Sequence, residues 1–329
     1  LMYDDEVKAE IQKLTGIKKS DKIPFVSISD YVKAINWHVS DPNNKIALIY
    51  AEGEIVDGQG DDRQIGSEKF TAIIRKARLD KKIKAVVLRI NSPGGSSVAS
   101  EAIWREVEIT KKEKPVVVSM GDYAASGGYY IACSADSVFA QPNTLTGSIG
   151  VFSVYANLSG LMNNKLGVTF DAVKTSASAD FGNLFRPMTD KERTVAQAST
   201  DSVYMTFKTR VAEGRSLNMQ YVDSIAQGRI WSGKQALQLK LVDRLGNIQD
   251  AIDCAARMAK LQHYQLKEYP VIESWWEKLV GGKDTKFSLS TLMSTEIGAE
   301  NYNILKQIQQ VKSWINMPQT RLPFWAEIK

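Results

Sequence analysis

Apolar residues along this chain alternate between short continuous runs and helical spacing. The stretches "KIALIYAEGEIV" (45–56) and "AVVLRI" (85–90) are β-rich, and an almost uninterrupted apolar run is typical of a strand covered on both faces of a parallel sheet. Between them, apolar residues recur at i, i+3, i+4 and i+7 over 70–77, after a serine suited to a helix N-cap. The pattern therefore predicts that a helix follows a strand here.

The same alternation continues through the middle of the chain. It predicts helices through "ASEAIWREVEITKK" (99–112) and "GYYIACSA" (128–135) and strands at "PVVVSM" (115–120) and "SVFAQ" (137–141). Successive βα units favour an α/β fold with a parallel sheet and helices outside it. In such sheets ligands bind at the carboxyl ends of the strands, where this chain has the glycine-rich turns "NSPGG" (91–95) and "YAASGG" (123–128).

Beyond these units, the pattern predicts a strand over 168–175, a long helix from near Thr189, a helix ending around 247–261 and a further amphipathic helix over 304–315. We divide the chain into an N-terminal segment (1–44), a central domain (45–265) and a C-terminal extension (266–329) with the last helix. The apolar and aromatic residues of the extension either pack on the core or form a surface for another subunit or a membrane.

Composition narrows the class of protein. A chain of 329 residues with 42 basic and 37 acidic residues, a formal net charge of +5, has no dense basic block, which argues against nucleic acid as a partner. No run approaches the roughly 18 apolar residues that span a bilayer, and the acidic opening "LMYDDEVKAEIQ" is unlike a secretory signal. Cys133 and Cys254 lack metal-ligand spacing, so no metal is expected, and a disulfide between them stays open.

The two glycine-rich turns carry the candidate chemistry. Ser126 is either a nucleophile on a strand-to-helix turn or a small residue that allows close packing. Amide hydrolysis through a serine also needs a base and two donors for the oxyanion. Gly94 and Gly95 have no side chains to keep a substrate carbonyl from their N–H groups, and Gly127 offers an N–H at a helix N-terminus. The two turns together supply the parts of an oxyanion hole.

Three strings of the sequence resemble a known family. "VLRINSPGGSSVASE", "KPVVVSMGDYAASGGYYIA" and "PNTLTGSIGV" resemble the signal peptide peptidase A family, also called protease IV, and the similarity extends from about residue 45 to residue 261. The resemblance implies a Clp protease/crotonase-like fold of repeated β-β-α units and a serine peptidase without a cofactor.

That family uses a Ser/Lys dyad. Carried over by its motifs, the nucleophile is Ser126, and Gly94, Gly95 and Gly127 form or border the oxyanion hole. Ser148 matches a serine that helps to orient the lysine, although a turn residue that caps the next segment would also explain it. His38 and His263 lie far from the predicted strand ends, so we expect exposed structural roles for both.

The expected lysine is absent. In short family members it precedes an aspartate in a stretch matching "VKTSASADF" (173–181), where this chain has Ala179 before Asp180. Lys174 stands five residues earlier, about 16 Å away in an extended chain and on the opposite face, so we expect it to be solvated at a strand edge. Long family members carry two tandem copies of the fold, with the lysine in the first copy and the serine in the second.

This chain resembles the second, serine-bearing copy. Its first residue is Leu1, and residues 1 to about 20 are similar in character to 241–261, as expected of the tail of a preceding copy. The resemblance implies a serine endopeptidase that degrades cleaved signal peptides on the periplasmic side of the bacterial inner membrane. The implied partners are peptide substrates, a lysine-bearing N-terminal half and a homo-oligomer, a tetramer of double-length chains.

Two other functions stay open at this point. A crotonase-like acyl-CoA enzyme would share the paired glycine turns but would need a carboxylate base, and Asp122 is the acidic residue beside the Ser126 turn. The other possibility is a non-catalytic scaffold half with a vestigial serine.

Overall fold

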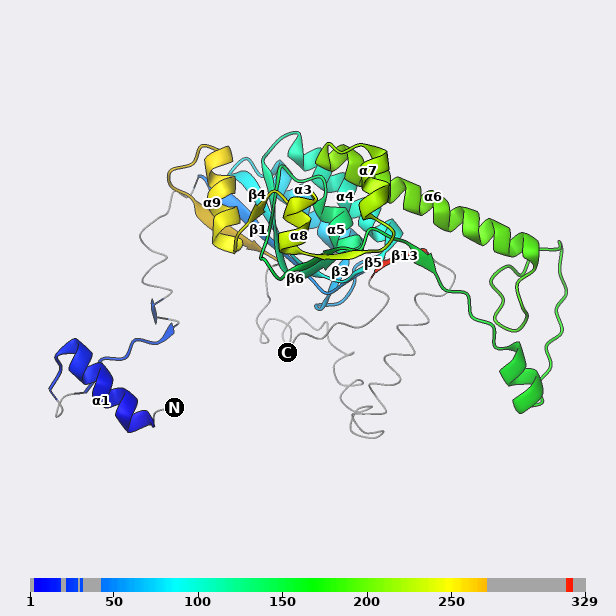
Figure 1. Cartoon of the computed structure of the whole chain (residues 1–329), viewed down its shortest axis with the longest axis horizontal. Coiled ribbons are helices and arrows are strands. Elements are labelled where there is room, and N and C mark those ends of the chain that lie inside the picture. Colours follow the sequence, from blue (N-terminus) through cyan, green and yellow to red (C-terminus); the bar gives the residue numbers. More distant parts are fainter. Residues whose placement is uncertain (1–2, 19–21, 29, 32–42, 271–317, 322–329) are drawn as a thin grey trace.

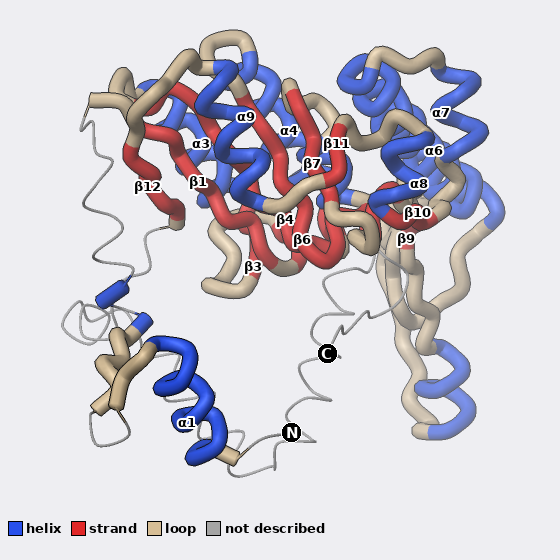
Figure 2. The backbone as a smooth tube through the Cα atoms, turned by 60° about the vertical axis from the view of Figure 1, so that its left-hand side comes forward, coloured by secondary structure: helices blue, strands red, loops and turns tan. Residues whose placement is uncertain are grey.

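The computed structural model describes residues 3–18, 22–28, 30–31, 43–270 and 318–321 (Figure 1). His38, the helix expected over 304–315 and most of the C-terminal extension, 266–329, lie outside the described residues, as do parts of the N-terminal segment, 1–44. The N-terminal helix α1 (Asp4–Thr15) lies apart from the sheets in both Figure 1 and Figure 2. The fold is therefore described from β1 onward.

Helices and strands alternate as the hydrophobic pattern predicts. The strands of the central domain are β1 (Lys45–Glu52), β2 (Glu54–Val56), β3 (Gln64–Gly66), β4 (Ile83–Ser92), β5 (Gly94–Ser96), β6 (Val116–Ala125), β7 (Ser137–Ala140), β8 (Leu145–Gly147), β9 (Phe152–Ser153), β10 (Ile230–Ser232), β11 (Arg244–Leu245) and β12 (Gln265–Tyr269). The helices are α3 (Ser67–Leu79), α4 (Ser97–Lys111), α5 (Gly127–Ala132), α6 (Asp190–Arg215), α7 (Met219–Ile225), α8 (Gly233–Gln238) and α9 (Ile248–Met258), with a short π-helical turn, η1 (Leu161–Lys165). One further strand, β13 (Pro318–Arg321), comes from the C-terminal segment.

The main sheet is parallel through its centre. Its strand order is β10-β8-β6-β4-β1-β12, with β7 paired to β6 and β11 to β7. Among the described strands of this sheet, only β10 pairs antiparallel, against β8 at the sheet edge, which is a common exception in large parallel sheets. Most residues of β4 and β6 are buried, as their continuous apolar sequences predict.

Helices cover both faces of this sheet, as Figure 2 shows. Alternate residues of β1, β4 and β6 point to opposite sides because side chains in a strand alternate. Ile49, Leu88 and Val118 lie in one core cluster, to which α3, α4 and α5 contribute, whereas Leu48 and Val87 lie in a second cluster with residues of α9. The predicted α/β class, with a parallel sheet and outer helices, is confirmed.

A second, smaller sheet lies at the carboxyl ends of the main strands. Its order is β3-β2-β5-β13-β9. Its strands β2 and β5 follow β1 and β4 directly; β5 leads straight to α4, and β3 stands between β2 and α3. This is the predicted β-β-α arrangement with one added short strand, and it places the small sheet beside the glycine-rich turns.

The predicted strand over 168–175 is wrong. Valine, phenylalanine and alanine alternate there with polar residues, which imitates a half-buried strand, but the segment has no strand partner and its residues are exposed. The ring of Phe170 instead stacks on Phe185, with 3.9 Å between ring centroids. The disulfide that the sequence left open does not form, since Cys133 and Cys254 are both buried free thiols.

The short helix α5 is held in the core by a tyrosine hydroxyl. Tyr129 is fully buried, and its Oη donates to the carbonyl of Leu241 at 2.8 Å. We expect Tyr129→Phe to lower the free energy of unfolding by about 1–3 kcal/mol, because it leaves a buried carbonyl without its donor. Denaturant unfolding measures the difference. Tyr31→Phe, at a side chain that is 60% exposed, is the matched control, and an equal effect of both substitutions would contradict this account.

Candidate active site

Ser126 stands on the sharp turn between β6 and α5. Its backbone has φ 54° and ψ −115°, in the positive-φ region that residues other than glycine rarely adopt. Its N–H donates to the carbonyl of Gly147 at 2.9 Å, and its carbonyl accepts from the N–H of Tyr130 at 2.8 Å. Bonds to β8 and to the first turn of α5 thus hold Ser126 in a backbone conformation of the kind found at functional sites.

The second glycine-rich turn follows β4. Pro93 separates β4 from β5, and Gly94 has φ +100°. The Gly94 N–H donates to Ser92 Oγ at 3.1 Å, inside the buried turn. Ser96 caps α4 by accepting from the N–H of Ala99 at 3.3 Å, and its hydroxyl donates to both carboxylate oxygens of Asp57 at 3.0 Å. These bonds fix the turn from both ends.

Strand register brings the two turns together. The parallel β4–β6 ladder pairs Ser92 with Ala124, so the residues that follow each strand leave the sheet side by side. A Cβ built on Gly94 would lie 2.7 Å from the Gly127 nitrogen, which leaves no room for a side chain. The structure therefore juxtaposes Gly94 and Gly95 with Ser126 and Gly127, as the candidate chemistry requires.

A backbone carbonyl from the C-terminal segment lies between the turns. The Thr320 oxygen is 2.0 Å from the Cβ position of Gly94 and 2.9 Å from that of Gly127. Gly127 is the first residue of α5, and the N–H of a first helical residue has no acceptor within its own helix. The Gly94 N–H donates to Ser92, and Gly95 pairs with Thr320 and Ile55 in the small sheet. The amides of Gly94, Gly95 and Gly127 are the candidate oxyanion donors.

Ser148 follows β8, which pairs with the end of β6 in register Ala125↔Gly147. It is buried, has φ 47°, and its N–H donates to the carbonyl of Arg229 at 2.8 Å. The carbonyl of Gly150, two residues on, accepts a long bond of 3.5 Å from the Ser126 hydroxyl. The Ser148 turn therefore borders the nucleophile turn, and the backbone at Gly150 is the acceptor that faces Ser126 Oγ.

The slot for the family's lysine lies in an exposed loop. Ala179 is exposed, and no lysine among the described residues hydrogen-bonds to Ser126 or Ser148. Lys174 is not on a strand edge, because its segment is not a strand; its Nζ pairs with Asp180 at 2.8 Å. Lys208, the buried lysine of α6, pairs with Asp223 at 2.6 Å. Both lysines are thus engaged by carboxylates of their own surroundings.

The loop that carries Ala179 is anchored by a cluster of charged residues. Arg186 bridges Asp180 at 2.7 Å and Glu192 at 2.6 Å. The hydrogen bond from Arg186 and the N–H of Thr189 lower the pKa of Glu192 to about 2, and Arg186 and Lys174 hold the pKa of Asp180 well below its ordinary value. Glu192 also completes the capping box that begins α6 at Thr189, where the sequence predicts the helix start.

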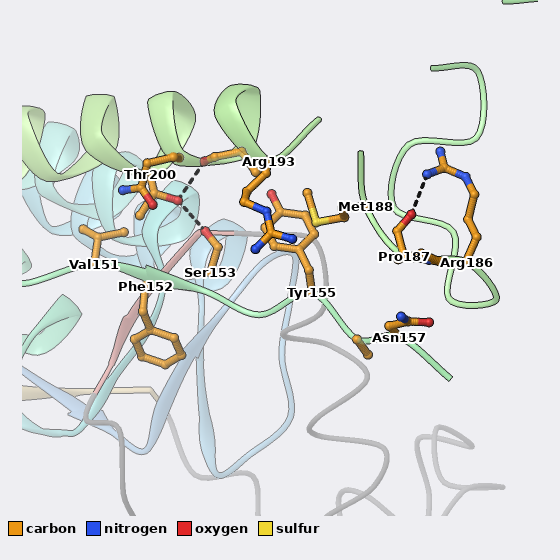
Figure 3. Close-up of a pocket in the computed structure, with 13 residues that line it drawn as sticks. Val151, Phe152, Ser153, Tyr155, Asn157, Arg186, Pro187, Met188, Arg193 and Thr200 are labelled. Atoms are coloured by element: carbon orange, nitrogen blue, oxygen red, sulfur yellow. Dashed lines mark hydrogen bonds between the residues drawn. The ribbon is translucent and has the colours of Figure 1, made fainter. Parts of the chain in front are cut away.

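A pocket of about 590 Å³ is lined by residues of β9, of α6 and of the loops between them (Figure 3). Phe152 and Ser153 of β9, Met188 of the preceding loop and Thr200 of α6 are among its lining residues, and the Ser153 and Thr200 hydroxyls lie 2.8 Å apart. None of the candidate residues Ser126, Gly94, Gly95, Gly127 or Ser148 lines it. The pocket is therefore distinct from the candidate site.

The remaining sequence predictions concern His263, metal ligands and membrane-spanning helices. His263 is exposed, as expected. In the part of the chain that the structure describes, no three His, Cys, Asp or Glu side chains gather as a metal site would require, and no helix has the length and apolar character needed to cross a bilayer.

Two contributors to the site were missed by sequence reasoning. Ser92 lies within "NSPGG". A serine hydroxyl often accepts a hydrogen bond from the backbone N–H two residues later in a turn, so the motif could have indicated this bond. Thr320 lies in "PQTR", a short polar stretch with no strand pattern, and nothing local marks it.

This arrangement of β-β-α units and paired turns is that of the Clp protease fold, and the Clp protease family profile matches residues 43–146. The profile of Peptidase family S49 matches residues 108–262. A putative signal peptide peptidase SppA of Enterococcus faecium is 37% identical over 270 residues, which cover 80% of this chain and 77% of that protein. The chain belongs to peptidase family S49.

Longer relatives match as well. Protease 4 of Haemophilus influenzae is 35% identical over 95% of this chain, and Protease 4 of Salmonella typhi is 42% identical over 80% of it. The chain spans 49% and 42% of their respective lengths. Among solved structures, a membrane-bound stomatin-specific protease mutant in complex with a substrate peptide aligns with TM-score 0.47 at 14% identity over 73% of this chain and 97% of that one. A ClpP1 mutant of Listeria monocytogenes aligns with TM-score 0.42 at 15% identity over 62% of this chain and 94% of that one.

The close approach of α5 to the first turn predicts the effect of an added methyl group. A Cβ on Gly128 would lie 2.7 Å from the Ser92 carbonyl oxygen. We expect Gly128→Ala to cost about 1–3 kcal/mol of stability, because backbone must shift to admit it. The matched control is Gly160→Ala, where a Cβ meets nothing within 4 Å. Thermal unfolding compares the two, and a Gly128→Ala protein as stable as the control would contradict the packing described.

The Arg186 cluster predicts an acid-sensitive loop. A carboxyl group with a folded-state pKa of about 2 stabilises the fold above its ordinary pKa, and that contribution is lost as the pH falls toward 2. Arg186→Ala should raise the pKa of Glu192 toward its ordinary value of about 4.3, since the leading cause of the depression is removed. Carboxyl-carbon NMR titration measures it. Arg193→Ala, at an exposed arginine one residue along α6 from Glu192, should leave the pKa low.

Proposed function

We propose that this chain is the serine-bearing half of a Ser/Lys-dyad endopeptidase that degrades cleaved signal peptides. The observation that carries the proposal is the convergence of the two glycine turns on one backbone carbonyl beside Ser126. A packing role for Ser126 would need neither the positive φ nor the second turn. The paired turns resemble a site that holds a peptide carbonyl against two N–H donors.

In the proposed reaction, Ser126 Oγ attacks the substrate carbonyl carbon as its proton passes to the lysine amine. The carbonyl π electrons move to the oxygen, and the N–H groups of Gly95 and Gly127 stabilise the resulting oxyanion. Collapse of the tetrahedral intermediate breaks the C–N bond, and the leaving amine takes the proton back from the lysine. Water then hydrolyses the acyl-enzyme in the same two stages. Gly94 borders this hole and, with Ser92, sets its shape.

The lysine is proposed to come from a partner half. A lysine acting as base at neutral pH must have its pKa lowered by several units from about 10.4, which requires burial in an apolar interface. Lys174 is not placed to serve, because its Nζ pairs with Asp180 at 2.8 Å in an exposed loop. Ser148 is placed in this proposal to orient the incoming lysine. The greater length of the Protease 4 relatives supports a two-half arrangement.

The substrate class, assembly and location follow from the family resemblance. We propose a homo-oligomer, a tetramer of double-length chains, at the periplasmic face of the bacterial inner membrane, where cleaved signal peptides remain in the bilayer. The central domain 45–265 would carry the site, and the 266–329 extension would face the membrane or another subunit. No cofactor takes part in the proposed reaction.

The test combines labelling with reconstitution. We expect the isolated chain to hydrolyse casein-derived fluorogenic peptides little or not at all, and addition of the lysine-bearing half to restore hydrolysis. In that assembly, Ser126→Ala should lower kcat/KM on the order of 10³-fold or more and abolish labelling by a fluorophosphonate. Ser224→Ala, at an exposed serine of α7, is the matched control.

Other outcomes identify the alternatives. Full activity of the isolated chain would contradict the two-half model. Unchanged cleavage in the Ser126→Ala assembly would point to a scaffold half with a vestigial serine. Tight binding of an acyl-CoA with no fluorophosphonate labelling would point to a crotonase-like enzyme. The carboxylate that such an enzyme needs is not evident, since Asp122 is exposed and lines a separate polar pocket with Arg89 and Tyr50.

A further inference from the structure

The helix α5, which follows the candidate nucleophile, is short, and its position depends on contacts with other helices. It has six residues, Gly127–Ala132, and an isolated helix of that length is not stable in water. Its first amide belongs to the candidate oxyanion hole. Ser126, just before it, has a positive φ, which persists only where neighbouring groups hold the backbone. The contacts that fix α5 therefore also fix the geometry of the proposed reaction.

A tyrosine one turn after Ser126 makes one of these contacts. The Tyr130 N–H donates to the Ser126 carbonyl at 2.8 Å, and the tyrosine is only 2% exposed. Its Oη donates to a carboxylate oxygen of Glu101 on α4 at 2.5 Å. Its ring centroid lies 4.5 Å from that of Phe207 on α6. A displacement of Tyr130 would therefore shift the Ser126 backbone through a single turn of helix.

The same side of α4 also holds the chain just beyond the end of α5. Trp104 is buried, and its Nε1 donates to the hydroxyl of Ser134 at 2.6 Å. Glu101 and Trp104 are three residues apart on α4, so their side chains lie on one face of that helix. This face of α4 thus contacts the α5 segment at Tyr130 and again at Ser134.

One arginine of α6 contacts both of these α4 side chains. The Arg210 Nη2 donates at 2.7 Å to the Glu101 oxygen that Tyr130 does not use, and this bond raises the pKa of Arg210. The guanidinium carbon lies 4.0 Å from the centre of the Trp104 ring. A planar guanidinium can pair with a carboxylate along its edge while its face stacks on an indole, which an ammonium cannot do. Arg210 therefore joins α6 to both residues of α4 that hold α5.

We propose that Arg210 is a positioning residue for the proposed reaction, acting through Glu101 and Tyr130. It holds α5 so that the Ser126 hydroxyl and the Gly127 N–H keep the geometry that the tetrahedral intermediate needs. The inference rests on the function proposed above, since that function makes Ser126 the nucleophile. Loss of Arg210 would leave α5 folded but less closely fixed, because the Glu101 carboxylate would lose its countercharge.

Kinetics of the assembly with the lysine-bearing half test the proposal. Arg210→Met removes the charge and keeps an unbranched side chain. It should lower kcat on fluorogenic peptides about tenfold with KM within about twofold, because misplaced reacting groups slow the chemical step more than they weaken substrate binding. Arg210→Lys keeps a cation beside Glu101 and should restore kcat to within about threefold of wild type.

The matched control is Arg75→Met. Arg75 of α3 pairs with a different carboxylate of α4, that of Glu106, at 3.0 Å, so the substitution breaks a similar pair between helices. It should leave kcat unchanged. Equal losses of kcat in Arg75→Met and Arg210→Met would overturn the proposal, as would an unchanged kcat in Arg210→Met.

A double-variant cycle tests the route through Tyr130. Tyr130→Phe removes the hydroxyl that donates to Glu101. If Arg210 acts through this contact, Tyr130→Phe with Arg210→Met should have a kcat within about twofold of the slower single variant. Losses that multiply in the double variant would overturn the proposed route. If Arg210→Met does not fold, Glu101→Gln removes the charge that Arg210 pairs with and takes its place in both comparisons, with the same expected results.

Hydrogen exchange separates this proposal from the proposed function. In the full chain, amide exchange of the segment 126–134, measured by mass spectrometry, should be at least about threefold faster in Arg210→Met than in wild type or Arg75→Met. If the wild-type assembly neither hydrolyses peptides nor labels Ser126, the proposed function fails, and faster exchange in Arg210→Met still shows that Arg210 holds α5. If hydrolysis is restored but kcat and exchange are the same in every variant, the nucleophile stands and the positioning role does not.

Discussion

The site depends on how closely two backbone turns approach each other. The β4–β6 ladder brings both turns to the same point, where a Cβ on Gly94 would lie 2.7 Å from the Gly127 nitrogen and a Cβ on Gly127 would meet Ser100 Oγ and Thr320. The two glycines are thus a geometric requirement, since any side chain would push the turns apart or fill the space that the Thr320 carbonyl occupies. Main-sheet register, which is set by burial on both faces, is therefore also what sets the spacing of the candidate oxyanion donors.

Much of the fold could be read from the sequence because its strongest signals are local. The continuous apolar runs of β4 and β6 and the capping box at Thr189 each specify their element within a dozen residues. The segment 168–175 shows the limit of such reasoning. Its alternating pattern is that of a half-buried strand, but a strand also needs a partner, and the chain offers none there.

The two turns of the candidate site could be predicted from the sequence, but the strand β13 beside them could not. The glycines of "NSPGG" and "YAASGG" indicate unusual backbone geometry, and the order of strands and helices predicts that the two turns lie close together. The hydrogen bond from the Gly94 N–H to Ser92 Oγ in the first turn could not be predicted from the sequence, because it depends on atomic distances. The ion pair between Arg321 and Glu54 joins residues 267 positions apart, and no periodicity in either segment predicts it.

The place of β13 in the small sheet has a consequence for the behaviour of the protein in solution. Without it, β5 and β9 would each present a row of unsatisfied N–H and C=O groups at an open edge, and such edges recruit strands from other molecules. Because β13 pairs with both strands, it covers these edges and shields them from self-association.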